Sequence, residues 1–128
     1  MLVIDDEETI RELLSSILTR FDHDVTIATD GMGGIKVFET GRFDLVLTDL
    51  GMPGVSGWKV AQRIRAIDPD AVVILITGWG VELDGNGLKE KGVDFVISKP
   101  FRVKQIMETI SKALTLRDCA LSKPVERK

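Results

Sequence analysis

The stretch that decides the fold of this chain runs from Leu45 to Gly54 and reads LVLTDLGMPG. Its first residues are apolar, and a short apolar run of this kind predicts a buried β-strand. The strand ends at Asp49, and Pro53 with the nearby glycines then forces a loop. Open α/β sheets carry their chemistry at the carboxyl ends of parallel strands, so Asp49 is the first candidate for a reacting group. For this stretch alone, an aspartate that merely starts the turn is the alternative.

Size and composition describe an ordinary globular domain. The chain has 128 residues, of which 44% are hydrophobic and 29% charged, and its net charge is −3. The lack of a basic excess argues against nucleic acid binding, and no apolar run approaches the ~20 residues of a membrane span. One cysteine and one histidine exclude an internal disulfide and zinc sites built from several such residues. We therefore expect a cytoplasmic protein.

Two apolar patterns alternate along the chain. Short continuous apolar runs predict five strands, over residues 1–4, 25–28, 44–49, 71–76 and 95–97. Apolar residues at helical spacing predict helices over residues 7–20, 32–40 and 102–116, another between the N-cap Ser56 and Pro69, and a weak one over 83–91. This alternation predicts a parallel sheet covered by helices on both faces. Residues 117–128 are polar and lack periodicity, so we expect a domain over residues 1–116 followed by a tail or linker.

Polar residues stand where four of the five predicted strands end: the pair Asp5-Asp6, then Asp49, Thr77 and Lys99. In a parallel sheet these ends share one edge. Helix capping by the acids and turn formation by Thr77 are the alternatives for each residue taken singly. Clustered carboxylates repel unless a cation enters, and Mg²⁺ suits a few carboxylates that meet a phosphate. A metal, a nucleophilic carboxylate, an ammonium and a hydroxyl together fit phosphoryl transfer to an aspartate.

With this order and spacing, the chain resembles the receiver domains of two-component response regulators over residues 2–116. The motifs that carry the resemblance are Asp5-Asp6, Asp49 followed by Met52-Pro53-Gly54 and Gly57, Thr77-Gly78, and Lys99-Pro100-Phe101. The resemblance implies a flavodoxin-like (βα)5 three-layer sandwich with strand order 2-1-3-4-5. It also implies a signalling module rather than a conventional enzyme.

The resemblance implies a role for each site residue. Asp49 would accept a phosphoryl group from a histidine kinase or a histidine phosphotransfer domain. Mg²⁺ would be held by Asp49, by Asp6 directly, by Asp5 largely through water, and by the carbonyl of Gly51. Thr77 and Lys99 would contact the phosphoryl oxygens, and the bond from Lys99 to Pro100 would be cis. Residues 79–101 would respond, and the surface formed by segments 83–91, 95–97 and 102–116 would mediate any homodimer.

The position of the aromatic switch departs from the receiver pattern. Val96 stands where receivers usually carry a switching aromatic residue, and strand alternation directs the neighbouring Phe95 to the other face. Trp79 follows Thr77 by two residues and is a candidate to flank the pocket mouth. Because glycines interrupt the weak helix, we expect residues 79–88 to be irregular before phosphorylation and ordered after it.

Three other functions are alternatives to the phosphoacceptor hypothesis. A pseudo-receiver would act as an interaction module without taking phosphate, although the phosphate-site residues are all present. A phosphatase of the haloacid dehalogenase type needs a second acid where Gly51 stands. A dinucleotide enzyme needs a glycine fingerprint after the first strand, where the sequence has acids.

Overall fold

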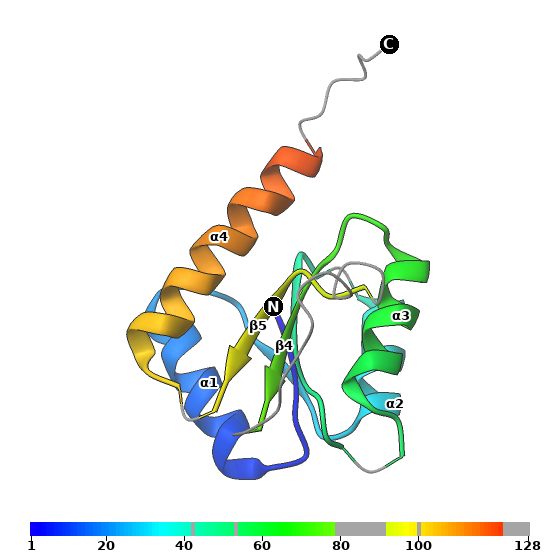
Figure 1. Ribbon diagram of the computed structural model, residues 1–128, viewed down its shortest axis with the longest axis horizontal. Coiled ribbons are helices and arrows are strands. Elements are labelled where there is room, and N and C mark those ends of the chain that lie inside the picture. The colour runs from blue at the N-terminus through cyan, green and yellow to red at the C-terminus, as the bar shows by residue number, and fades with distance from the viewer. Residues whose placement is uncertain (42, 53, 79–91, 100, 122–128) are drawn as a thin grey trace.

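The computed structural model describes residues 1–41, 43–52, 54–78, 92–99 and 101–121 (Figure 1). Its strands pair in parallel in the order β2-β1-β3-β4-β5, which confirms the predicted sheet. The strands are β1 (Leu2–Ile4), β2 (Thr26–Ala28), β3 (Leu45–Asp49), β4 (Val72–Thr77) and β5 (Phe95–Ser98). The weak helix predicted over 83–91 and the segment 79–88 lie outside the described residues.

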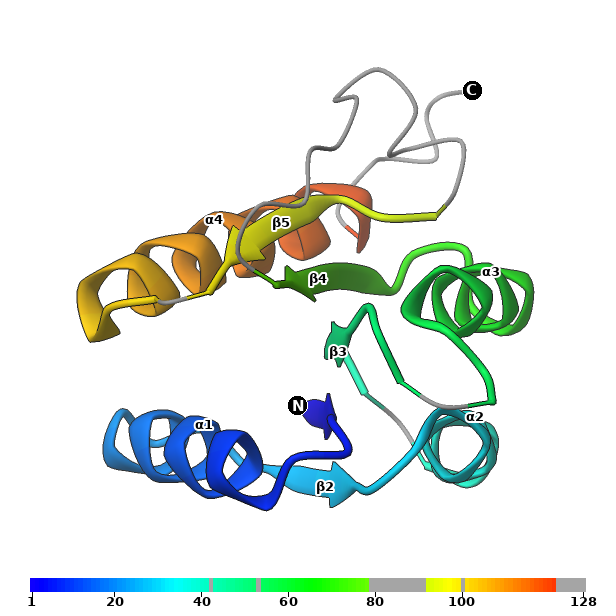
Figure 2. The ribbon, with the colours of Figure 1, turned by 60° about the horizontal axis from the view of Figure 1, so that its bottom comes forward.

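The described helices form two layers, one on each face of the sheet. They are α1 (Glu8–Arg20), α2 (Gly31–Thr40), α3 (Gly57–Ile67) and α4 (Val103–Leu121). Figure 2 shows α1 and α4 together on one face and α2 and α3 on the other. Consecutive strands are thus joined by crossovers that return the chain to the same edge of the sheet, as parallel pairing requires.

The apolar strand residues alternate between two cores because successive side chains point to opposite faces. In β4, Val73 and Leu75 pack into the core beneath α2 and α3. Ile74 and Ile76 pack into the core beneath α1 and α4. All residues of β4 are buried, which explains why this strand reads as a continuous apolar run rather than an alternating one.

The start of each of two helices is set by a local side chain. Ser56 caps α3, as predicted, because its Oγ accepts a hydrogen bond from the backbone N of Lys59 at 3.4 Å. Asp30 caps α2 through its Oδ1, which accepts from the backbone N of Gly33 at 2.7 Å. Gly34 lowers the intrinsic helix propensity, but a Cβ there would lie 2.3 Å from Cδ1 of Ile4. The glycine therefore allows α2 to lie close against β1.

The predicted end of the last helix, at residue 116, is wrong, because α4 continues to Leu121. Leu116 packs against the core beneath α1 and α4. The next residue, Arg117, forms ion pairs with Asp44 at 3.5 Å and with Asp68 at 3.2 Å. These contacts join residues far apart in the sequence, so the polar composition of residues 117–128 did not reveal the extension.

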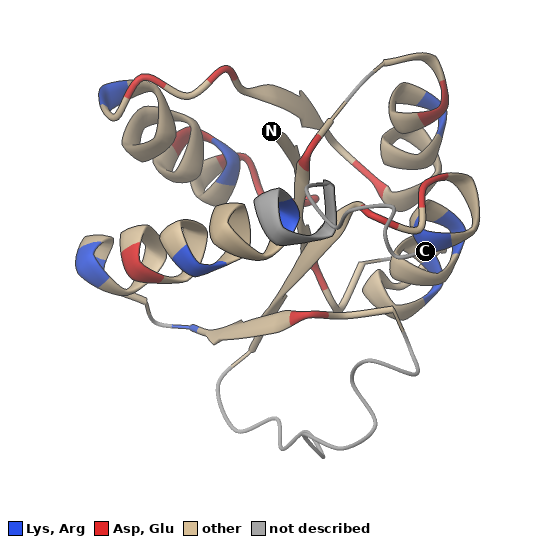
Figure 3. Ribbon diagram, turned by 90° about the horizontal axis from the view of Figure 1, so that it is seen from above, with Lys and Arg blue, Asp and Glu red and all other residues tan. Residues whose placement is uncertain are grey.

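Charged residues of both signs are spread over the two helical layers. Figure 3 shows lysine and arginine interspersed with aspartate and glutamate on the helices. None of the helices in the described ranges combines the length and the apolar character that crossing a membrane would require.

Candidate functional site

Asp49 is the last residue of β3 and lies in the middle of the sheet's carboxyl edge. Its side chain is almost fully buried, between β1 on one side and β4 on the other. The Oγ1 of Thr48 donates a hydrogen bond to the carbonyl of Asp49 at 3.1 Å. A Cβ on Gly57 would lie 2.4 Å from the same carbonyl. The absence of a side chain at Gly57 thus lets α3 begin directly beside Asp49.

Asp5 follows β1 and is completely buried. Its Oδ1 accepts a hydrogen bond from the backbone N of Glu7 at 2.9 Å, and its carbonyl accepts one from Nη1 of Arg11 at 2.8 Å. Its Oδ2 has no hydrogen-bond partner within the described part of the chain. Burial raises the pKa of Asp5 to about 6, and the charge of Asp49 adds to this, while the Glu7 N–H and Lys99 oppose it.

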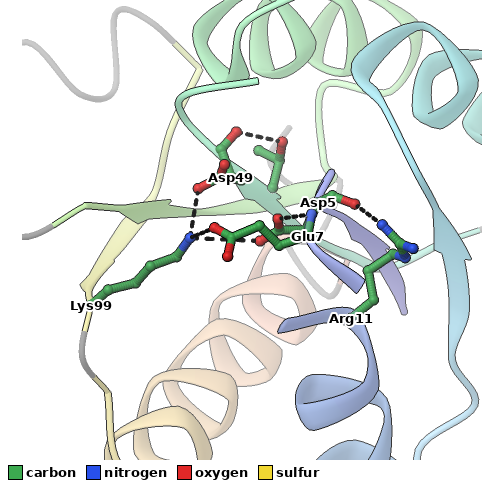
Figure 4. Close-up of polar contacts among 6 residues, drawn as sticks. Asp5, Glu7, Arg11, Asp49 and Lys99 are labelled. Carbon is green, nitrogen blue, oxygen red and sulfur yellow. Dashed lines mark hydrogen bonds and ion pairs between the residues drawn. The ribbon is translucent and has the colours of Figure 1, made fainter. Parts of the chain in front are cut away.

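Lys99 follows β5, which is separated from β3 by β4. Its long side chain reaches across to the carboxylates of Asp49 and Asp5 (Figure 4). Its Nζ lies 3.2 Å from Oδ1 of Asp49 and 3.9 Å from Oδ2 of Asp5. The side chain is 20% exposed. Burial alone would lower the pKa of Lys99, but the charges of Asp49 and Asp5 outweigh it, so the pKa is raised and the ammonium stays charged.

Asp5, Asp6 and Asp49 form a group with the chemistry of a metal site. One carboxylate oxygen from each lies within 4.8 Å of the others. Asp6 is exposed, whereas the other two are buried. The oxygen-only donor set and the orphaned Oδ2 of Asp5 fit a hard divalent cation such as Mg²⁺. The predicted acidic residues therefore come together as expected from the sheet topology.

Thr77 completes the polar set at this edge. It is the last residue of β4, is fully buried, and pairs in register with Ser98. Its Oγ1 has no hydrogen-bond partner among the described residues. Buried hydroxyls are nearly always hydrogen-bonded, so this one stands out among the described polar groups at the carboxyl edge.

Some of the remaining predicted positions lie within the described residues and others lie outside them. Gly51 is exposed, and no atom lies within 4 Å of where its Cβ would stand. Val96 is partly buried in the core beneath α2 and α3, whereas Phe95 packs into the opposite core. The predicted alternation of these two side chains is thus confirmed. Trp79 and Pro100 lie outside the described residues, as does the geometry of the Lys99–Pro100 bond.

One residue at the site was not recognised from the sequence. Oε1 of Glu7 lies 3.4 Å from Nζ of Lys99, beyond the reach of any local pattern because the two are far apart in the chain. The only sequence signal was the position of Glu7 within the acidic run after the first strand.

Comparison with known proteins agrees with this geometry. Residues 1–111 match the response regulator receiver domain family. The chain is 32% identical to sporulation initiation phosphotransferase F of Bacillus subtilis (strain 168), covering 91% of this chain and 94% of that protein. It is 33% identical to the probable transcriptional regulator ycf27 of Cyanidium caldarium, covering 89% of this chain but 45% of that protein. The chain thus spans about half the length of several curated relatives that it matches.

Solved structures share the fold over most of the chain. A response regulator receiver domain protein from Clostridium thermocellum is 28% identical, with a TM-score of 0.82 over 93% of this chain and 96% of that one. A CheY-like receiver domain protein from Methanospirillum hungatei JF-1 is 25% identical, with a TM-score of 0.85 over 91% and 94% of the two chains. The flavodoxin-like fold and strand order expected from the sequence are confirmed.

Proposed function

Because this chain belongs to the family of response regulator receiver domains, we propose that Asp49 accepts a phosphoryl group from a histidine kinase or a histidine phosphotransfer protein. The observation that carries the proposal is the buried Asp49 carboxylate with the Lys99 ammonium 3.2 Å away and the carboxylates of Asp5 and Asp6 beside it. The proposed role is that of a signalling module which takes a phosphoryl group, rather than that of a conventional enzyme.

In the proposed reaction, a carboxylate oxygen of Asp49 forms a bond to phosphorus. The phosphorus–nitrogen bond of the phosphohistidine breaks, and its electron pair returns to the imidazole. Lys99 stays protonated and pairs with the phosphoryl oxygens, and the free hydroxyl of Thr77 donates to them.

Asp5, Asp6 and Asp49 would hold Mg²⁺, with the carbonyl of Gly51 as a further ligand. When bound, the ion supplies positive charge against the phosphoryl oxygens and relieves the repulsion among the carboxylates. The residues from 79 to 101, including Trp79, Val96 and Pro100, would then respond to the phosphoryl group. The fold supports this placement because Thr77 precedes that segment, Lys99 lies near its end, and both stand at the carboxyl ends of the neighbouring strands β4 and β5.

Phosphorylation with a small donor tests the proposal directly. With Mg²⁺ and acetyl phosphate, the protein should gain one base-labile phosphoryl group, detected by intact mass and located on Asp49. The Asp49→Asn variant keeps the shape of the side chain and should gain none. A parent that stays unlabelled with saturating donor would instead favour a pseudo-receiver, an interaction module that does not take phosphate.

A further inference from the structure

Lys99 is shared by three carboxylates, and the third has no place in the proposed phosphoryl transfer. Besides Asp49 and Asp5, its Nζ pairs with Oε1 of Glu7 at 3.4 Å. Figure 4 shows the Glu7 side chain directed at the lysine from the start of α1. Glu7 is 59% exposed, in contrast to the two buried aspartates. It therefore lies at the solvent side of the site, where a phosphoryl donor must enter.

Glu7 occupies a helix position at which glutamate is not a preferred residue. Glu7 is the N-cap residue of α1, but its side chain makes no capping hydrogen bond. Serine, threonine, asparagine and aspartate are preferred at this position, because their short side chains reach the free N–H groups of the first turn. The longer glutamate leaves the helix start without a side-chain cap and contacts Lys99 instead.

We propose that Glu7 is a positioning residue that holds Lys99 before phosphoryl transfer and restrains the reaction with highly anionic donors. This inference rests on the proposed phosphoacceptor function. Lys99 has to exchange its contact with Glu7 for one with the incoming phosphoryl oxygens, so the glutamate competes with the phosphoryl group for the ammonium. The Glu7 carboxylate also places a negative charge beside the entering anion and repels it.

The effect should be moderate and dependent on charge. Because Glu7 is largely solvated, we expect Glu7→Gln to raise the initial rate of labelling by acetyl phosphate by about threefold at low salt. Glutamine has nearly the same shape and can still accept a hydrogen bond from Lys99, so the change isolates the charge. The gain should shrink at high salt, where exposed charges are screened. It should also be smaller with phosphoramidate, which carries less net negative charge than acetyl phosphate at neutral pH.

The neighbouring Glu8 provides a matched control. It is an exposed glutamate in the first turn of the same helix, and Glu8→Gln removes the same charge from the next residue. We expect its rate to stay close to that of the parent under every condition. In the metal-free protein, the side-chain NMR signals of Lys99 should shift in Glu7→Gln but not in Glu8→Gln, which reports on the ion pair without any phosphorylation.

The outcomes separate this inference from the function on which it rests. A faster, salt-sensitive and donor-dependent Glu7→Gln variant beside an unchanged Glu8→Gln variant would support it. Labelling of the parent with equal rates in both variants, or a gain unaffected by salt and donor, would overturn the inference alone. If the parent takes no label at all, the proposed function is wrong and the inference falls with it.

Discussion

The two edges of the sheet use charged residues in opposite ways. At the amino edge, Asp94 accepts hydrogen bonds through Oδ2 from Nη2 of Arg65 at 2.5 Å and from the backbone N of Val73 at 2.9 Å. At the carboxyl edge, Oδ2 of Asp5 and Oγ1 of Thr77 are buried without a hydrogen-bond partner among the described residues. The Asp94 carboxylate is thus hydrogen-bonded within the protein, whereas these two side-chain atoms at the carboxyl edge are not bonded to any described residue.

This difference predicts that the Arg65–Asp94 pair stabilises the fold and that Asp5 and Thr77 serve the proposed function. Arg65 also donates to the carbonyls of Pro69 and Gly92, so it ties α3 to the segments that enter β4 and β5. At the carboxyl edge, by contrast, the single ammonium group of Lys99 forms ion pairs with three carboxylates. Since unsatisfied buried groups lower stability, removing acids should have opposite effects at the two edges.

The largest expected effect is a loss of stability at the amino edge. Asp94→Ala should lower the free energy of unfolding by about 3 kcal/mol, because it leaves Arg65 without its carboxylate partner and the N–H of Val73 without its acceptor. The partial exposure of Arg65, 32%, keeps the loss at the low end for a buried pair. Urea unfolding measures it. Asp44→Ala is the control, because Asp44 is 67% exposed in its pair with Arg117 and should lose little. Equal losses in both variants would contradict the comparison.

At the carboxyl edge, we expect Asp5→Asn to stabilise the metal-free protein at neutral pH by roughly 2 kcal/mol. At ~1.4 kcal/mol for each unit of pKa the rise in the pKa of Asp5 would give about 3 kcal/mol, but the amide is a weaker acceptor for the N–H of Glu7 than the carboxylate. The pKa of Asp5 is raised from 3.8 to about 6, so its ionised form is disfavoured in the folded protein. The parent should therefore lose stability as the pH rises through this interval, and the gain in the variant should vanish at about pH 4.

Urea unfolding with a chelator, at neutral pH and at about pH 4, measures the difference in stability between the parent and Asp5→Asn. Adding Mg²⁺ gives a second comparison of the two proteins. Binding to the folded parent should add about 1.4 kcal/mol at a Mg²⁺ concentration ten times its Kd, and less to Asp5→Asn. A variant that is less stable than the parent at neutral pH without metal would show that Asp5 is structural, like Asp94.

The smallest expected effect compares two buried threonines on neighbouring strands. Thr77→Val replaces a hydroxyl that has no partner within the described residues and should raise stability by about 1 kcal/mol while impairing phosphoryl transfer. Thr48→Val removes the hydrogen bond to the carbonyl of Asp49 and should lower stability by about 1 kcal/mol. Thermal unfolding of the two variants checks the signs. A loss at Thr77 equal to that at Thr48 would mean that its hydroxyl is already paired.

Much of the site was predictable because its residues follow directly from the strand pattern. The apolar runs that end at Asp49 and Thr77 locate these residues at strand ends, and parallel pairing brings strand ends to one edge. The ends of helices were harder, since α4 continues past residue 116 only through the packing of Leu116 and the ion pairs of Arg117.

Periodicity and chain connectivity are local properties. They were enough to predict the class of fold, the order of the elements and the edge at which Asp5, Asp49, Thr77 and Lys99 meet. Which charges are paired became visible in the three-dimensional arrangement alone. The pairing of Glu7 with Lys99 and of Arg65 with Asp94 joins residues that are distant in the chain. Such pairs depend on distances through space and on burial, and neither is encoded in the spacing of residues along the chain.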